Sequence, residues 1–176
     1  MIILSTNKRL KPKLNTILLF LILICAIVVI VLLVKNSQML TPDYAPGEID
    51  TNAIKEKDND KKMDVSDGGG AVSLSYSNVV SIDLDSKKAK LYFKNPSKSR
   101  ENVVLEIVVK QGEKEVVVAK SGVIPTGYAI YEMKLNKNAR LAKGGYNGLF
   151  KVMYYDEDTS EKQIVNTEID ITIDVK

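Results

Sequence analysis

An uninterrupted apolar run near the N-terminus constrains this chain more than any other feature. Residues 17–34 read ILLFLILICAIVVIVLLV and contain no charge, amide or hydroxyl group. As an α-helix they would extend about 27 Å, at roughly 1.5 Å per residue, close to the roughly 30 Å of a bilayer's hydrocarbon core. The run therefore predicts a single transmembrane helix over residues 17–35, in contact with membrane lipid through residues 17–34.

Three other interpretations of this run are less favoured. A buried helix of a globular domain rarely contains so long a stretch without a polar residue. A cleaved signal peptide has a shorter apolar region followed by small residues, whereas this run continues into VLLVKNSQML. A lipidated cysteine normally follows a small residue, but Cys25 follows Ile24 in the middle of the run. An uncleaved signal anchor is the favoured interpretation.

The charges beside the run predict its orientation. Residues 1–16 carry four cations and no acid: Lys8, Arg9, Lys11 and Lys13. Positive charges next to a span are retained on the cytoplasmic side of the membrane. We therefore expect residues 1–16 to form a basic cytoplasmic tail of a single-pass cell-membrane protein. The C-terminal part would then be extracytoplasmic.

The segment that follows the run has the composition of a linker. Residues 36–70 include Pro42, Pro46 and Gly47, then a KEKDNDKKMD stretch of mixed charge, and end in three glycines. A segment with so few apolar residues cannot bury enough surface to offset the entropy lost on ordering. The composition predicts a flexible extracytoplasmic linker over residues 36–70.

Beyond residue 70 the apolar residues alternate with polar ones, which is typical of β-strands. In the last run, Val165 to Val175, every second residue is apolar or threonine. Valines occupy both faces of the run from Val103 to Val109, which indicates a central strand covered on both sides at one end. Such runs, separated by turn residues, predict an all-β domain over residues 71–176. We expect an antiparallel immunoglobulin-like β-sandwich of about seven to nine strands.

A local motif supports this fold. Leu141, Gly144 and Tyr146 form a Leu-x-x-Gly-x-Tyr pattern just before a long strand. The pattern resembles the tyrosine corner of immunoglobulin-like domains, in which a tyrosine hydroxyl bonds to upstream backbone. The resemblance predicts that the Tyr146 hydroxyl bonds to a backbone group near Leu141, while its ring closes the end of the core. The role of this tyrosine corner is structural.

The wider pattern resembles a family. The runs LYFKNPSKSRENVVLEIVV, VVVAKSGVIPTGYAI, LAKGGYNGLFKVMYYD and VNTEIDITIDV are similar to small membrane-tethered immunoglobulin-like envelope proteins of Gram-positive bacteria. Some members of that family are associated with conjugative elements. The resemblance covers about residues 72–176 and implies a fold and a location at the envelope, with no catalytic motif to transfer. Unlike antibody domains, this region has no cysteine pair and no tryptophan.

The residue types present also restrict the chemistry. The chain has no histidine, so Ser-His and Cys-His nucleophilic pairs and histidine metal sites are excluded. We predict no catalytic, cofactor-binding or metal-binding residue and expect no small-molecule substrate. Residues 71–176 carry sixteen basic and fourteen acidic residues, and this near-neutral balance gives no reason to expect a nucleic-acid partner.

Acidic groups leave two alternatives open. A carboxylate-dependent hydrolase would use pairs on one strand face or at a strand end, and a solvated outer face is the favoured interpretation of these acids: Glu168, Asp170 and Asp174, with Asp83 and Asp85. The turn of Asp156, Glu157 and Asp158 offers oxygens to calcium, although its spacing lacks the EF-hand pattern and favours a plain polar hairpin.

Tyrosines provide the remaining functional signal. An exposed tyrosine is a good contact residue for a protein or a glycan, and the candidates are Tyr128, Tyr131, Tyr154 and Tyr155. The sequence favours a non-enzymatic, membrane-anchored interaction module. Such a module would bind another envelope protein or assemble in a surface or transfer complex. The alternative is a carbohydrate- or cell-wall-binding domain, with the hydrolase less favoured.

Overall fold

The structure, a computed structural model, describes residues 14–37, 43–58, 61–64, 72–112 and 114–176. The chain divides into two units, Met1–Thr41 and Pro42–Lys176. Most of the predicted cytoplasmic tail, residues 1–13, lies outside the described residues, as do residues 38–42, 59–60 and 65–71 of the region predicted as a linker.

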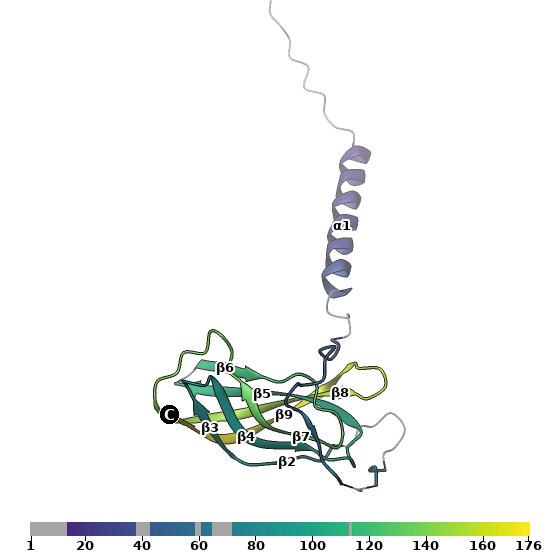
Figure 1. Cartoon of the computed structure of the whole chain (residues 1–176). Helices are drawn as coiled ribbons and strands as arrows, with labels where there is room; N and C mark the ends of the chain where they lie inside the picture. Colours follow the sequence, from purple (N-terminus) through teal and green to yellow (C-terminus); the bar gives the residue numbers. More distant parts are fainter. Residues whose placement is uncertain (1–13, 38–42, 59–60, 65–71, 113) are drawn as a thin grey trace, which may run out of the picture. The chain divides into compact units, whose positions relative to one another are not determined.

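The first unit contains one described helix, α1 (Leu14–Ser37; Figure 1). No proline or glycine occurs between Pro12 and Pro42, so nothing in the sequence interrupts it. The side chains described in α1 are those of residues 17–32, and all are exposed, the large apolar ones to between 46% and 70%. Among the residues so described, no helix meets the length and apolarity of a candidate membrane span.

In the described residues of the second unit, nine strands form one sheet, so the prediction of an all-β domain is confirmed. The sheet order is β1-β7-β4-β3-β9-β8-β5-β6, and β2 pairs with β4. The strands are β1 (Ile54–Lys55), β2 (Ser75–Tyr76), β3 (Val79–Asp83), β4 (Lys88–Asn95), β5 (Glu101–Gln111), β6 (Lys114–Lys120), β7 (Tyr128–Lys134), β8 (Gly144–Asp156) and β9 (Lys162–Val175).

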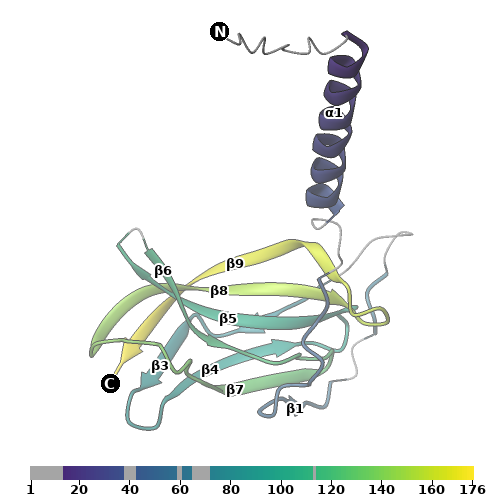
Figure 2. The same ribbon diagram turned by 90° about the horizontal axis from the view of Figure 1, so that it is seen from above.

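One strand pair departs from the antiparallel sheet that the sequence predicts. β3 pairs in parallel with β9, from Val79 opposite Thr172 to Ile82 opposite Val175, whereas every other named pair is antiparallel. β3 also pairs with β4 on its other side. β3 therefore links two groups of strands that form opposite sides of the domain (Figure 2). The first group is β1, β7, β4 and β3 itself, and the second is β9, β8, β5 and β6.

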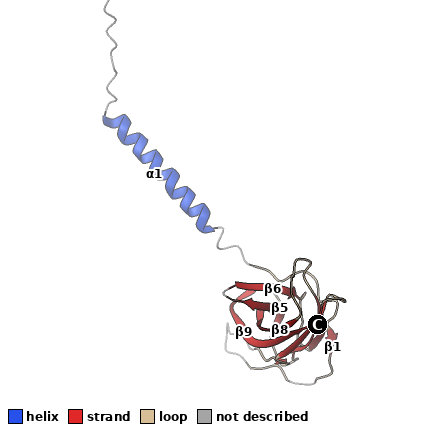
Figure 3. Ribbon diagram, turned by 90° about the vertical axis from the view of Figure 1, so that its left-hand side faces the viewer, coloured by secondary structure: helices blue, strands red, loops and turns tan. Residues whose placement is uncertain are grey.

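The sheet curls over on itself (Figure 3), so that β6 at one end of the strand order meets the segment that follows β7. Ala119 at the end of β6 forms a bridge with Leu135 just after β7, and the Asn136 N–H donates to the Val118 carbonyl at 2.8 Å. The curl encloses the main core, in which the rings of Phe93 and Phe150 meet edge to face with centroids 5.9 Å apart. The largest fully buried side chains are Phe93, Phe150, Ile82, Leu105, Ile107, Ile124, Ile130, Met133, Ile173, Val80, Val103 and Val104.

The valines on both faces of β5 are buried, as the sequence predicts for a central strand. Val103, Leu105, Ile107 and Val109 belong to the main core. On the opposite face Val104 belongs to a second buried cluster of Val104, Val123, Met153 and Tyr155, against which Ala45 packs. The second cluster shows that part of the outer face of β5 and β8 is covered.

The prediction of a flexible linker is wrong for much of its length. The N-terminal strap, as we call residues 43–64 (described at 43–58 and 61–64), belongs to the second unit, which starts at Pro42 and not at residue 71. Tyr44 bridges to Glu161, Ile49 bridges to Val123, and β1 pairs with β7. The prediction from composition was wrong because the strap is held by backbone hydrogen bonds to neighbouring strands and by a few ion pairs, and these do not require much buried apolar surface.

Candidate functional site

The predicted tyrosine corner has the geometry expected from its motif. The Tyr146 hydroxyl donates to the Ala142 carbonyl at 3.0 Å. Leu141 and Tyr146 both pack against the main core. Gly144, with φ of +139°, adopts a backbone conformation that disfavours other residues, and it starts β8. Leu141, Gly144 and Tyr146 therefore hold the start of the central strand β8.

Two of the four predicted contact tyrosines are buried, so neither presents an exposed ring on the outer surface. Tyr154 is 7% exposed and its hydroxyl donates to Thr167 Oγ1 at 2.7 Å. Tyr155 is 3% exposed and belongs to the second buried cluster with Val123. As neighbours on β8, Tyr154 and Tyr155 lie on opposite faces of the sheet. Tyr154 belongs to the main core, and Tyr155 is buried because the strap covers the outer face there. Burial raises the pKa of both phenols.

The other two predicted tyrosines lie on β7. Tyr128 is half-buried against the main core, whereas Tyr131 is 44% exposed. The Tyr131 ring lies 5.6 Å from the Tyr92 ring, centroid to centroid. Tyr131 also lines an open hollow between the strap and β4, together with Thr51, Asn52, Ile54, Lys90, Leu91 and Glu132. Of the predicted contact residues, Tyr131 is therefore the one that presents an aromatic ring beside hydrogen-bonding groups.

A charge cluster fastens the strap beside this hollow. Lys94 of β4, with its side chain 13% exposed, pairs with Glu56 at 2.8 Å and with Asp58 at 2.9 Å. Glu56 also accepts a hydrogen bond from the Tyr131 hydroxyl. Its bonds to Lys94 and Tyr131 lower the pKa of Glu56, and the two carboxylates raise the pKa of Lys94.

Replacing Lys94 should loosen the strap. In Lys94→Met, Glu56 and Asp58 lose their shared cation while remaining 24% and 14% exposed. We expect a loss of about 2 kcal/mol in the free energy of unfolding, because the charges are partly buried. Hydrogen exchange should accelerate at the Glu56 amide, which donates to the Gly127 carbonyl at 2.9 Å. Exchange measured by mass spectrometry or NMR reports this opening directly.

The matched control for this change is Lys88→Met. Lys88 pairs with Glu132 at 2.6 Å, but the two side chains are 46% and 37% exposed, so its loss should change stability by about 0.5 kcal/mol or less. Because the folded pKa of Glu56 is lowered, its stabilisation is present above its unfolded pKa and is lost as pH falls through the folded value. Equal exchange at Glu56 in both variants would contradict a fastening role for Lys94.

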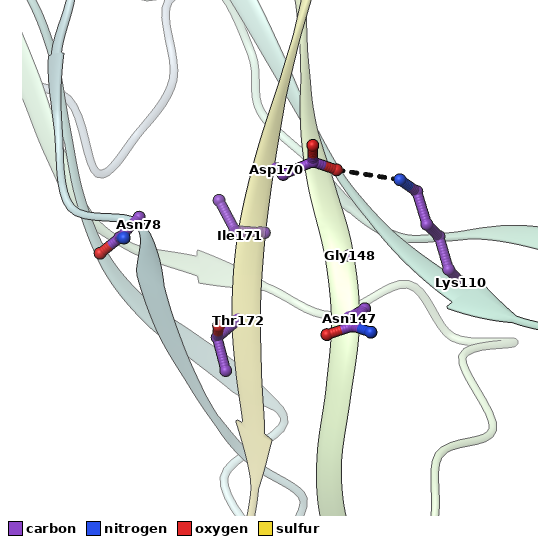
Figure 4. Close-up of a pocket in the computed structure, with 7 residues that line it drawn as sticks. All are labelled: Asn78, Lys110, Asn147, Gly148, Asp170, Ile171 and Thr172. Carbon is purple, nitrogen blue, oxygen red and sulfur yellow. Dashed lines mark hydrogen bonds and ion pairs between the residues drawn. The ribbon is translucent and has the colours of Figure 1, made fainter.

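The acids considered for hydrolysis are spread over the outer surface and engaged separately. Asp170 pairs with Lys110 at 2.9 Å, Glu168 pairs with Lys151 at 3.3 Å, and Asp174 lies 3.5 Å from Lys176. Asp83 accepts the backbone N–H groups of Asp85 and Ser86. Figure 4 shows the Lys110–Asp170 pair at a shallow polar hollow on β8 and β9, also lined by Asn78, Asn147, Gly148, Ile171 and Thr172. The charges of both Asp170 and Glu168 act on Lys110, and each of these carboxylates pairs with a lysine, which does not favour a hydrolytic pair.

The acidic turn after β8 is organised by its own backbone. Asp156 Oδ1 accepts the N–H groups of Asp158 at 3.0 Å and Thr159 at 2.7 Å, which lowers the Asp156 pKa. Glu157 pairs with Lys62 of the strap at 2.8 Å. Within the described part of the chain, no three acidic or cysteine side chains gather in a way that could hold a metal ion.

Sequence reasoning missed Glu101, the most unusual acid of the domain. It is 5% exposed, and Gln163 Nε2 donates to its carboxylate at 3.3 Å. Burial, together with the negative charges of Asp156 and Glu157, raises its pKa. Glu101 lines an open hollow of about 500 Å³ with Val72, Tyr154, Gln163, Ile164, Val165 and Thr167. The sequence carries no signal for this site, because a single Glu at the start of a strand is usually solvated.

Comparison with known proteins adds little to this geometry. No protein-family model and no curated protein matches the chain. Among solved structures, the chain is similar to AggA, the major subunit of aggregative adherence fimbriae type I from Escherichia coli. The two share 10% sequence identity with a TM-score of 0.34, over 62% of this chain and 97% of that chain. A likeness this weak carries no argument about function.

Proposed function

We propose that this chain is a membrane-anchored interaction module. Its cytoplasmic tail would be short and basic, α1 would cross the cell membrane once, and an immunoglobulin-like domain would bind an envelope protein outside the cell. The observation that carries the proposal is α1 itself. It is 24 residues long, and its described side chains are apolar and exposed although the β-domain has a complete core of its own.

Exposed apolar side chains in such number need an apolar environment. Leaving a Leu, Ile, Val or Phe in water instead of burying it costs about 1.5–3 kcal/mol. All of the side chains described in α1 are exposed. The full apolar run, residues 17–34, extends past the side chains that the structure describes. Its length matches the hydrocarbon core of a bilayer, and the cations of residues 1–16 support a cytoplasmic N-terminus.

The strand order supports the immunoglobulin-like assignment. In constant-type immunoglobulin domains, strands A, B, E and D form one sheet and strands C, F and G form the other, with C′ added in variable types. If β3 to β9 correspond to A, B, C, C′, E, F and G, the neighbours within each group of strands agree with this order, and the parallel β3–β9 pair joins the two groups. Tyr146 then lies near the start of strand F, where a tyrosine corner occurs. β1 of the strap occupies the position of strand D beside β7.

Crosslinking on intact cells tests the interaction function. The full-length chain at its native expression level, treated with a membrane-impermeant crosslinker and then purified, should carry one reproducible envelope protein. A variant with the strap and β-domain removed, but with residues 1–41 kept, controls for neighbours captured through the membrane alone. Recovery of the uncrosslinked chain alone, or the same proteins from the control, would refute the proposal.

The hollow at Tyr131 favours one alternative, a carbohydrate- or cell-wall-binding domain. Tyrosine rings present an apolar face with a polar tip, and here Tyr131 lies beside Asn52, Lys90 and Glu132. Tyr131→Ala should then remove binding to isolated wall material. Tyr44→Ala is the matched control, because Tyr44 is 55% exposed but lies outside the hollow. Equal binding by both variants would exclude the Tyr131 hollow as the wall-binding site.

A further inference from the structure

A buried acid without a cation lies next to an exposed apolar bulge at one end of the domain. Glu101 is the first residue of β5, and its side chain lines the hollow of about 500 Å³ described above. Among the described residues, the Glu101 carboxylate accepts one side-chain hydrogen bond, from the neutral Gln163, and forms no ion pair with a Lys or Arg. The charged neighbours that act on Glu101, Asp156 and Glu157, are acidic as well.

The nearby cation of the strap is already used. Lys62 pairs with Glu157 at 2.8 Å and also donates to the Ser99 carbonyl at 2.9 Å. A carboxylate that is 5% exposed and beside like charges destabilises the folded state when ionised. Its raised pKa agrees with this, because a group with a raised acidic pKa costs stability once pH rises above its unfolded value. A cation placed in the hollow would remove that cost.

The rim of the hollow is apolar because β9 bulges there. Pairing between β8 and β9 shifts between Met153 opposite Asn166 and Tyr155 opposite Lys162. Three residues of β9, Gln163, Ile164 and Val165, therefore lie opposite the single residue Tyr154. The bulge turns Ile164 and Val165 outward, where they are 99% and 68% exposed. Ile164 and Val165 thus form a small exposed apolar patch beside the hollow, which is available to a partner.

We propose that the Glu101 hollow receives a lysine or arginine side chain from an extended segment of a partner protein. The cation would pair with the Glu101 carboxylate, and the aliphatic stem would lie along Val72 and Tyr154. Apolar residues flanking the cation would pack on Ile164 and Val165. Charge complementarity selects this occupant, since the hollow combines one uncompensated negative charge with an apolar lining. The inference rests on the proposed interaction function and specifies its contact site.

Two matched peptides test the site on the full-length chain in detergent micelles. The probe is a blocked pentapeptide of alternating valine and threonine with a central arginine. Its control replaces the arginine with citrulline, which is neutral and nearly the same shape. NMR titration at the Ile164 and Thr167 amides gives the two dissociation constants. We expect the arginine peptide to bind about tenfold more tightly, the value of one charge-assisted contact.

Three variants complete the test. Glu101→Gln should bring the ratio of the two affinities close to one. Ile164→Ser should weaken both peptides alike and keep the ratio, and its 99% exposed side chain makes a folding defect unexpected. Asp170→Asn removes an exposed acid elsewhere on β9 and should change neither the two affinities nor their ratio.

Three outcomes would overturn the site. The first is equal affinity of the wild type for both peptides, including no binding at millimolar concentration. The others are an unchanged affinity ratio in Glu101→Gln and unchanged affinities in Ile164→Ser. An envelope partner crosslinked equally by wild type and Glu101→Gln would overturn this site while leaving the proposed function intact.

Discussion

Two arginines in the middle of the apolar run, Leu21→Arg with Val28→Arg, are expected to prevent the membrane insertion that we propose for this chain. Each arginine at the centre of a spanning helix costs about 2.5–3.5 kcal/mol, and each lost Leu or Val removes about 0.3–0.6 kcal/mol of favourable insertion. The pair together costs about 6–8 kcal/mol, which corresponds to roughly a 10⁴- to 10⁶-fold shift in partitioning. The measurement is the amount of protein left in membranes after an alkaline carbonate wash.

The control for this prediction keeps the composition of the run. Leu21→Ile with Val28→Leu exchanges apolar residues and should leave the chain in the membrane fraction. The β-domain should keep its circular dichroism spectrum in both double variants, since it forms a unit separate from the helix. Retention of the arginine variant after the wash, or release of the wild-type chain by the wash, would show that the apolar run does not anchor this protein.

Local patterns in the sequence predicted the strands, because a strand with one buried face has an apolar residue at every second position. The alternation predicted from Val165 holds from Thr167 to Val175, where every second residue is half-buried or buried, but Val165 itself is 68% exposed. The same reasoning predicted that both faces of β5 are covered at one end, and its buried residues belong to two separate clusters. The Tyr146 hydrogen bond was also predictable, since its partner Ala142 is only four residues upstream. These features depend on residues close together in the chain.

Features that depend on distant segments could not be predicted in this way. Tyr155 is buried because Val123 and the strap residue Ala45 cover the outer face of β8. The strap itself is held by Lys94, far from Glu56 in sequence, and a count of charges shows no such match. Glu101 acquires its hollow only when Val72 and the bulge of β9 are brought to it. In each case the partner is supplied by the topology of the sheet.

Gly148 shows the same dependence in a form that a single substitution can measure. It lies within β8, paired with Val109 of β5 and Ile171 of β9. A Cβ atom added there would lie 2.5 Å from the Val108 carbonyl oxygen and 2.5 Å from Ile173 Cδ1. Ile173 is fully buried, and the carbonyl belongs to the backbone of a neighbouring strand, so neither can move aside at little cost. The missing side chain allows β5, β8 and the Ile173 side chain to meet.

Gly148→Ala is therefore expected to lower the free energy of unfolding by about 3 kcal/mol, the upper range for overpacking a core. The melting temperature should fall by about 10 °C for a domain of this size. Urea denaturation of the full chain in micelles, followed by circular dichroism, measures the change. Gly145→Ala is the control, since nothing lies within 4 Å of the added Cβ on the same strand, and it should change stability by less than about 0.5 kcal/mol. Similar stabilities for the two variants would mean that the close approach of β5 and β8 at Gly148 does not limit this fold.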